Sequence, residues 1–343
     1  MHMADALLSP AVGATMWLAS GAALAWSARR IRAQGDDRLV PLMGVLGAFV
    51  FAAQMINFAI PATGSSGHLG GGLLLSILLG PHAALIVIAS VLTVQALFFA
   101  DGGLLALGAN IFNLGVLPCF IAYPLVYRPI AGDGTSVPRI AIGAAVAAIV
   151  GLQLGALGVV LQTVASGISS LPFSAFLLLM LPIHLAIGVV EGLATAAIVL
   201  FIRRARPDLI APAAGTPPSR ASLKPLLATL GLAAVITGGA LSWFASSQPD
   251  GLEWSIEGAA GSARLAAPAQ GLHGWLAGLQ QKLSFLPGYG LPSAAHAAEP
   301  DKTAQAAPWP AIDGGTSLAG LVGAVVTLAL VWALALLLKR RRR

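Results

Sequence analysis

The 343-residue chain is far more apolar than a water-soluble protein: 57% of its residues are hydrophobic, 9% are charged, and its mean hydropathy is +0.86. Soluble globular domains carry about 25% charged residues, so lipid must be the solvent for most of this chain. The net charge of +6 comes from basic residues between apolar stretches, which argues against nucleic acid as a partner. A single cysteine, Cys119, excludes a disulfide framework and a thiolate cage for a metal ion.

Nine apolar stretches follow one another along the chain, and most reach the roughly 20 residues that a membrane-spanning helix needs. They are residues 11–28, 39–60, 69–79, 81–100, 104–127, 140–163, 173–202, 225–245 and 317–338. The stretch 69–79 is about half the usual length, as in a re-entrant segment, and its length alone does not tell whether it crosses fully. We expect an all-α membrane protein: a bundle of about seven transmembrane helices, followed by a C-terminal two-span module.

The positions of Lys and Arg predict the orientation, because these residues favour the cytoplasmic side of short loops. With the N-terminus outside and residues 69–79 counted as a crossing, sixteen of the nineteen Lys and Arg residues fall on the cytoplasmic side. Only Arg264, Lys282 and Lys302 fall outside. We therefore expect a multi-pass protein of the cell inner (plasma) membrane, with its N-terminus outside and its C-terminus in the cytoplasm.

A composition change divides the chain into two parts. Residues 204–223 are rich in Pro, Gly and Ser, which predicts a cytoplasmic linker between a membrane domain at 1–203 and a two-span module at 224–343. Within the module, the polar segment 246–316 predicts an outer loop that is only partly ordered.

The first two residues are a candidate chelate. The opening of the chain contains no basic segment and does not resemble a cleaved signal. Because a bulky second residue generally prevents removal of the initiator methionine, we expect Met1 to keep a free amine in front of His2. The amine, the deprotonated His2 amide and the His2 imidazole then close adjoining five- and six-membered rings around one ion. Such a tetragonal nitrogen site suits Ni(II) and Cu(II).

His68 is the candidate for the fourth nitrogen. It lies in a glycine-rich loop on the same expected outer face as Met1, where Gly64 and Gly67 allow the backbone to fold inward. Gln54 and Asn57 are polar amides in apolar sequence, and we expect them to hold the two imidazole rings through outer hydrogen bonds.

Several blocks of the chain resemble one transporter family. The opening Met1-His2-Met3-Ala4-Asp5 resembles that of the nickel/cobalt substrate-binding components (NikM/CbiM) of energy-coupling factor transporters, and blocks at 51–57, 64–70, 95–103, 106–110 and 184–192 agree in order. The resemblance covers roughly residues 1–202. It implies an extracytoplasmic metal site made of the Met1 amine, the His2 amide and imidazole, and the His68 imidazole. It also implies Ni2+, or Co2+ for cobalamin synthesis, as the transported substrate, and the loop around His68 is more similar to the nickel branch.

The second half is similar to the small companion subunit of NikN or PDGLE type, here fused to the same chain. Residues 249–254, Pro-Asp-Gly-Leu-Glu-Trp, carry this resemblance, which implies a role in metal loading or in assembly. We identify no convincing ligand set there. None of the lysines lies in a phosphate-binding loop motif, so this chain is not expected to bind ATP. The resemblance implies partners instead: cytoplasmic ATPase subunits and a transmembrane coupling (T) subunit.

Two ionisable residues, His184 and Glu191, lie seven positions apart in an apolar stretch and would share a helix face. We expect them to stabilise the bundle through hydrogen bonds. Two alternatives to transport remain open: an intramembrane metal-dependent enzyme using His184 and Glu191, and a receptor that senses metal without carrying it. Because the chain contains neither His-Glu-x-x-His nor Gly-x-Ser-x-Gly, the sequence favours a transporter subunit over an enzyme.

Overall fold

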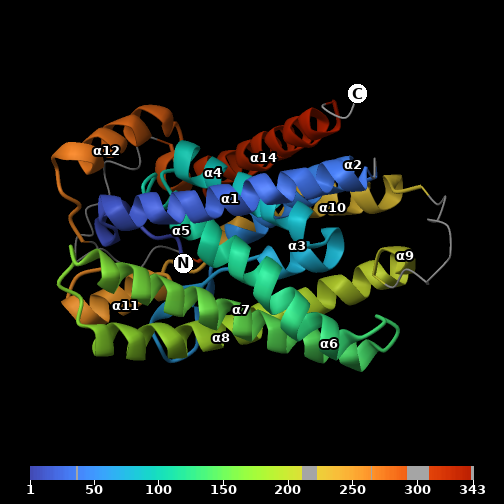
Figure 1. Cartoon of the computed structure of the whole chain (residues 1–343), viewed down its shortest axis with the longest axis horizontal. Coiled ribbons are helices and arrows are strands. Elements are labelled where there is room, and N and C mark those ends of the chain that lie inside the picture. The colour runs from blue at the N-terminus through green and yellow to red at the C-terminus, as the bar shows by residue number, and fades with distance from the viewer. Residues whose placement is uncertain (36–37, 211–221, 264, 292–308, 341–343) are drawn as a thin grey trace.

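The structure is a computed structural model that describes residues 1–35, 38–210, 222–263, 265–291 and 309–340. Its main elements are helices that run side by side along the longest axis of the molecule (Figure 1). In chain order they are α1 (Pro10–Gln34), α2 (Leu39–Gln54), α3 (Gly72–Leu79), α4 (Pro81–Phe98), α5 (Leu107–Ile111), α6 (Arg128–Ala131), α7 (Val137–Ser166), α8 (Phe173–Ala205), α9 (Pro207–Ile210), α10 (Lys224–Gly239), α11 (Gly251–Ala260), α12 (Gly271–Leu283) and α14 (Gly314–Arg340). The described strands are β1 (Phe58–Ile60) and β2 (Ser65–Gly67), which form one antiparallel hairpin.

Five helical segments of the described chain are long and apolar enough to cross a membrane: Pro81–Phe98, Leu107–Ala131, Val137–Ser166, Phe173–Ala205 and Gly314–Lys339. The expectation of an all-α membrane protein is confirmed. Helices α2 and α10, at 16 residues each, are apolar but shorter. Helix length and hydropathy therefore do not by themselves establish the expected number of membrane crossings, which was seven in the bundle and two in the C-terminal module.

Helix α3 shows how the short apolar stretch at 69–79 is used. Its eight residues rise about 12 Å, less than half of the roughly 30 Å hydrocarbon core. The next helix nevertheless starts beside the last turns of α1, where His82 and Ser27 are hydrogen-bonded at 3.2 Å. The chain covers the distance because the hairpin before α3 already lies inside the bundle, with Ser65 and Ser66 completely buried.

The two helices of the C-terminal module, α10 and α14, pack against each other and against α2. They approach closely where Gly238 meets Gly320, since a methyl group on Gly320 would collide with the Gly238 backbone. Small residues commonly permit such contacts between membrane helices. Helix α9 directly follows α8, and residues 211–221 of the predicted linker lie outside the described chain.

The segment 246–316 contains more regular structure than its composition predicts. Helix α11 packs on α8, and α12 packs on α4. A capping box starts α11, because Asp250 accepts hydrogen bonds from the first turn while Glu253 reaches back to the Asp250 N–H. In α12, Gln280 donates to the carbonyls of Ala96 and Gly102. The described parts of this segment thus cover one end of the bundle, and residues 292–308 lie outside the described chain.

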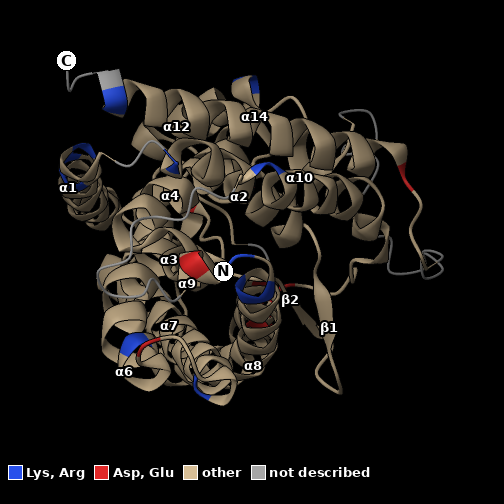
Figure 2. Ribbon diagram, turned by 90° about the vertical axis from the view of Figure 1, so that its right-hand side faces the viewer, with Lys and Arg blue, Asp and Glu red and all other residues tan. Residues whose placement is uncertain are grey.

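The two ends of the bundle differ in charge. Figure 2 looks onto the end where basic residues gather, at the last turns of α1 and α8, the start of α10 and the end of α14. Helices α11 and α12 lie at the opposite end (Figure 1). The N-terminal residues lie on the α11 side of the molecule, inside the bundle.

Candidate metal centre at the N-terminus

The first residues of the chain are inserted into the bundle rather than exposed on it. Met1 is 5% exposed and Met3 is fully buried. The Asn110 side chain holds the Met3 backbone at both ends: its Oδ1 accepts from the Met3 N–H at 2.8 Å, and its Nδ2 donates to the Met3 carbonyl at 3.2 Å. Asp5 accepts from the Ala106 N–H at 2.9 Å. These bonds fix the position of the amine at the start of the chain.

Two glycines make room for this insertion. Gly102 has a φ of 82°, which favours glycine over residues that carry a Cβ. A side chain at Gly103 would collide with Asp5, and the Gly103 N–H donates to the Met3 carbonyl at 2.9 Å. The N-terminal segment therefore depends on a glycine turn after α4.

His68 reaches the same place from the β1–β2 hairpin, which it follows directly. The loop after it is anchored by Glu191, whose carboxylate oxygens accept the N–H groups of Gly70 and Gly71 at 3.0 Å each. A Cβ on Gly70 would lie 3.1 Å from that carboxylate. The expected hydrogen bonding of Glu191 within the bundle is confirmed, and it holds the loop that carries His68.

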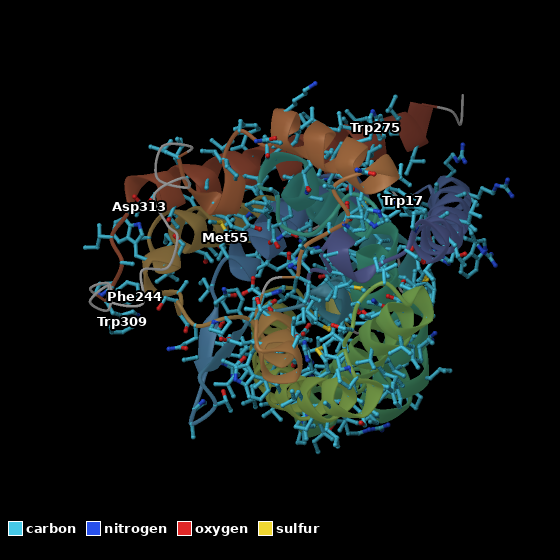
Figure 3. The ribbon with its side chains drawn as sticks, turned by 90° about the vertical axis from the view of Figure 1, so that its left-hand side faces the viewer. Trp17, Met55, Phe244, Trp275, Trp309 and Asp313 are labelled. Carbon is cyan, nitrogen blue, oxygen red and sulfur yellow. The ribbon has the colours of Figure 1, made fainter. Side chains whose placement is uncertain are left out.

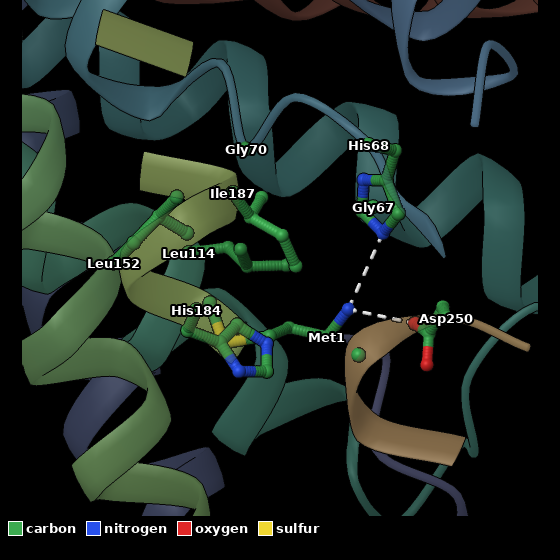
Figure 4. A pocket seen from close by; sticks show the side chains of 10 residues that line it. Met1, Gly67, His68, Gly70, Leu114, Leu152, His184, Ile187 and Asp250 are labelled. Atoms are coloured by element: carbon green, nitrogen blue, oxygen red, sulfur yellow. Dashed lines mark hydrogen bonds and ion pairs between the residues drawn. The ribbon is translucent and has the colours of Figure 1, made fainter. Parts of the chain in front are cut away.

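The three residues that the sequence predicts as ligands come together. The Met1 amine lies 3.3 Å from His68 Nε2 (Figure 4). The rings of His2 and His68 stack with centroids 5.0 Å apart. In the predicted chelate the His2 amide lies between the amine and the His2 imidazole, so a fourth ligand must neighbour both of them. Donors at right angles around an ion about 2.1 Å away lie about 3.0 Å apart. The distance of 3.3 Å between the amine and His68 Nε2 is close to this value, and the His68 ring lies against the His2 ring.

A hydrogen bond sets the tautomer of the His68 ring. A carbonyl or amide oxygen can only accept, so His68 Nδ1 donates to the Leu69 carbonyl at 3.1 Å and leaves the Nε2 lone pair facing Met1. Both nitrogens of the His2 ring face oxygen atoms: Nε2 lies 3.1 Å from Gln95 Oε1, and Nδ1 lies 3.4 Å from Asp101 Oδ1. Nδ1 is the nitrogen that closes the six-membered chelate ring.

The electrostatics keep both imidazoles neutral. Burial, then the Met1 ammonium and His2, lower the pKa of His68 to about 3. Burial is also the main reason that the pKa of His2 is lowered. Burial raises the pKa of Asp250, but the Met1 ammonium and His68 outweigh it and hold this pKa below its usual value. Two uncharged rings and a carboxylate thus surround the amine.

Side chains alone do not make the site. Within the described chain, no group of three His, Cys, Asp or Glu side chains is arranged to hold a metal ion.

Gln95 is a supporting residue that the sequence analysis missed. It is fully buried in α4, binds the His2 ring, and donates through Nε2 to Gln54 Oε1 at 2.9 Å. Gln54, predicted to hold a ring directly, instead orients Gln95 and donates to the Gly70 carbonyl at 2.8 Å. Asn57 accepts the Ser246 N–H through its backbone carbonyl. A buried amide within an apolar helix was the available signal for Gln95.

Asp250 of the C-terminal module was also missed. Its Oδ2 forms an ion pair of 3.0 Å with the Met1 amine (Figure 4). Asp101, which follows α4, places Oδ1 3.4 Å from His2 Nδ1, and its Oδ2 accepts from the Tyr289 hydroxyl at 2.6 Å. The available signal for Asp250 was an acidic residue within the Pro-Asp-Gly-Leu-Glu motif.

A cavity of about 910 Å³ lies beside His2 and His68, between the two halves of the protein. Both halves line it, and Figure 3 views the end of the molecule where two lining residues, Met55 and Asp313, lie. Its acidic lining residues are Asp101, Asp250, Glu253 and Asp313. Carboxylates around a cavity concentrate cations there.

A cavity of about 10 Å³, the size of one water molecule, lies on the inner side of the Met1 amine (Figure 4). It is lined by Met1, His68, His184 and Asp250, among others. His184 Nδ1 donates to the Met180 carbonyl at 2.8 Å, a bond within its own helix α8 that joins no two helices of the bundle. His184 and Glu191 bond to different backbone groups and do not form a pair.

Comparison with known proteins identifies the family. Residues 2–209 match the cobalt uptake substrate-specific transmembrane region, CbiM, and residues 224–340 match the PDGLE domain. The chain belongs to the CbiM family. This CbiM-family chain is 40% identical over 214 residues to a protein of Archaeoglobus fulgidus named "Putative fused nickel transport protein NikMN", and the match covers 61% of this chain and 68% of the relative. It is 32% identical over 227 residues to the fused nickel transport protein NikMN of Rhodobacter capsulatus, covering 62% and 64%.

A solved structure supports the same assignment. The crystal structure of a truncated transition metal transporter is 31% identical, with a TM-score of 0.52, and the match covers 60% of this chain and 99% of the other. The resemblance to NikM/CbiM fused to a NikN or PDGLE-type module is confirmed.

Proposed function

We propose that this chain captures Ni2+ or Co2+ at its N-terminus as the substrate-binding component of an uptake transporter. The observation that carries the proposal is the convergence of the Met1 amine with the His2 and His68 rings, with His68 Nε2 facing the amine. The names of the matching family and relatives, which refer to cobalt uptake and nickel transport, agree with this chemistry.

The proposed ligands are the Met1 amine, the His2 amide and imidazole, and the His68 imidazole. Nitrogen sites bind Cu2+ more strongly than Ni2+, and Ni2+ more strongly than Co2+, so the ligand set does not select between nickel and cobalt. We favour nickel as the substrate, because the loop around His68 is more similar to the nickel branch of the family.

We further propose that the site faces the extracytoplasmic side. The basic residues gather at the other end of the bundle, and Lys and Arg in short loops favour the cytoplasmic side. A hydrated cation would enter the acidic cavity and exchange its water for nitrogen ligands. Release into the cell would be driven by separate ATPase subunits acting through a transmembrane coupling subunit, as in energy-coupling factor transporters.

The enzyme alternative finds little support in the arrangement of His184 and Glu191. Glu191 is occupied by two backbone N–H groups, and His184 is bonded to its own helix. Cells with and without the gene, supplied with radioactive Ni2+, separate a transporter from a receptor that senses metal, because only a transporter raises the nickel content of the cell.

A pair of tagged proteins tests the capture site. A short peptide added before Met1 converts the amine into an amide, whereas the same peptide added after residue 343 leaves it free. We expect the first protein to lose Ni2+ binding and the second to keep it, as measured by calorimetry on purified protein in detergent. Equal Ni2+ affinity of both proteins would contradict the proposed chelate.

A further inference from the structure

Helix α12 is attached to the bundle by polar side chains instead of apolar ones. His273 is buried, and its Nε2 donates to the Leu8 carbonyl at 2.8 Å. Gln280, seven positions later and therefore on the same face of the helix, donates to the carbonyls of Ala96 and Gly102. The polar face of α12 thus lies against the protein, which is the reverse of a helix on the surface of a soluble protein.

The apolar side chains of α12 gather on a neighbouring flank that the protein leaves uncovered. Leu272, Trp275 and Leu283 are 43%, 65% and 39% exposed. At 100° per residue they lie within about 80° of one another around the helix axis. Phe285, just after the helix, is also exposed. Soluble monomers rarely expose large apolar side chains so close together, so this apolar flank needs an apolar partner.

A third side of α12 is small and polar. Gln281 is exposed and lies about 120° around the helix from Trp275, and the exposed Ala277 lies on the same side as Gln281. A helix with one apolar flank and one polar flank is typical of the boundary between lipid and water.

The position of α12 in the molecule agrees with such a boundary. The helix lies at the end of the bundle opposite to the basic residues (Figure 1). Trp17, which is 40% exposed in the second turn of α1, lies toward the same side of this end as Trp275 (Figure 3). Tryptophan favours the level of the lipid headgroups in membrane proteins.

We propose that the apolar flank of α12 lies in the lipid leaflet at this end of the protein, between the headgroups and the acyl chains. Lys282, exposed and seven positions after Trp275, would reach the phosphate of a lipid headgroup while its methylene stem stays beside the indole ring. Lipid fits this flank better than a second protein chain does, because the flank is a narrow row at the rim of a membrane-spanning bundle and combines Trp with Lys.

The lipid contact would anchor the outer cover of the bundle. Gln280 holds carbonyls on both sides of the turn that follows α4. The same helix therefore connects the lipid leaflet to the glycine turn that makes room for the N-terminal segment.

Dye-labelled variants of the full-length protein in phosphatidylcholine vesicles test this proposal. The buried Cys119 is first replaced by alanine, and the environment-sensitive dye NBD is then attached in Trp275→Cys, in Gln281→Cys or in Leu178→Cys. Leu178 is 71% exposed on the apolar helix α8 and serves as the lipid-facing control. Phosphatidylcholine brominated in the upper part of its acyl chains should quench the dye in Trp275→Cys and in Leu178→Cys. Iodide in the aqueous phase should quench the dye in Gln281→Cys.

Two results would overturn the proposal. One is quenching by brominated lipid that is no stronger in Trp275→Cys than in Gln281→Cys, since both flanks of α12 would then meet the same solvent. The other is a dye in Trp275→Cys that neither brominated lipid nor iodide reaches, because a second protein chain would then cover the flank.

Discussion

Replacement of Gln95 by methionine tests how the protein orients its metal ligands. The substitution keeps the length of the side chain but removes the acceptor of the His2 Nε2–H and the donor to Gln54 Oε1. The His2 ring would lose its hydrogen bond to α4, and it would be free to rotate or to change tautomer. The ligand atoms themselves remain in the protein.

The magnitude follows from the two broken hydrogen bonds. Residues that orient a metal-binding imidazole typically contribute 10–100-fold to metal affinity, so we expect Gln95→Met to weaken Ni2+ binding by about 10–100-fold, or about 1.4–2.7 kcal/mol. Each buried polar group left without a partner also destabilises the folded protein by about 1–3 kcal/mol. Thermal stability without metal should fall as well.

A matched variant separates orientation from stability. Gln153→Met makes the same change on α7, where Gln153 donates to the Leu181 carbonyl at 2.8 Å, away from the site. Calorimetry with Ni2+ and thermal unfolding in detergent are measured on both variants. The reasoning is refuted if Gln95→Met binds Ni2+ as tightly as Gln153→Met, whatever the two unfolding temperatures are.

Three further predictions concern protons, the His68 loop and the N-terminal segment. Ni2+ affinity should fall as pH falls, by about 10-fold per pH unit for each proton that the amine and the amide release. No additional loss from His68 is expected between pH 7 and 5, because its pKa is lowered to about 3, and calorimetry in buffers of different ionisation enthalpy counts the protons. Glu191→Gln replaces one carboxylate oxygen, which accepts a backbone N–H, by an amide group that is itself a donor. The variant should lose about 1–3 kcal/mol of folding stability and still bind one Ni2+ per chain. Loss of all metal binding would favour the enzyme alternative. Gly103→Ala should expel the N-terminal segment through its collision with Asp5 and abolish Ni2+ binding, whereas Gly21→Ala, at an open position on α1, should leave binding unchanged in the same assay.

Sequence alone determined the class of fold and the proposed core of the metal site. Long apolar runs must become helices in lipid, because every backbone polar group there needs a partner within its own segment. The amine, the amide and the imidazole of the first two residues are joined by covalent bonds, so their capacity to chelate requires no knowledge of the fold. His68 could be added because its loop was expected on the same side of the membrane.

The tertiary structure decided which groups surround those ligands. Gln95 and Asp250 lie 93 and 249 residues from their partners at the N-terminus, and neither pairing follows from any helical or strand periodicity. The eight-residue α3 likewise reaches the far end of the bundle only because a buried hairpin precedes it. The sequence fixes the types of donor that are present, but the distances between donors far apart in the chain are set by how helices and loops pack. Only packing could show that the C-terminal module presents a carboxylate to the first amine of the chain.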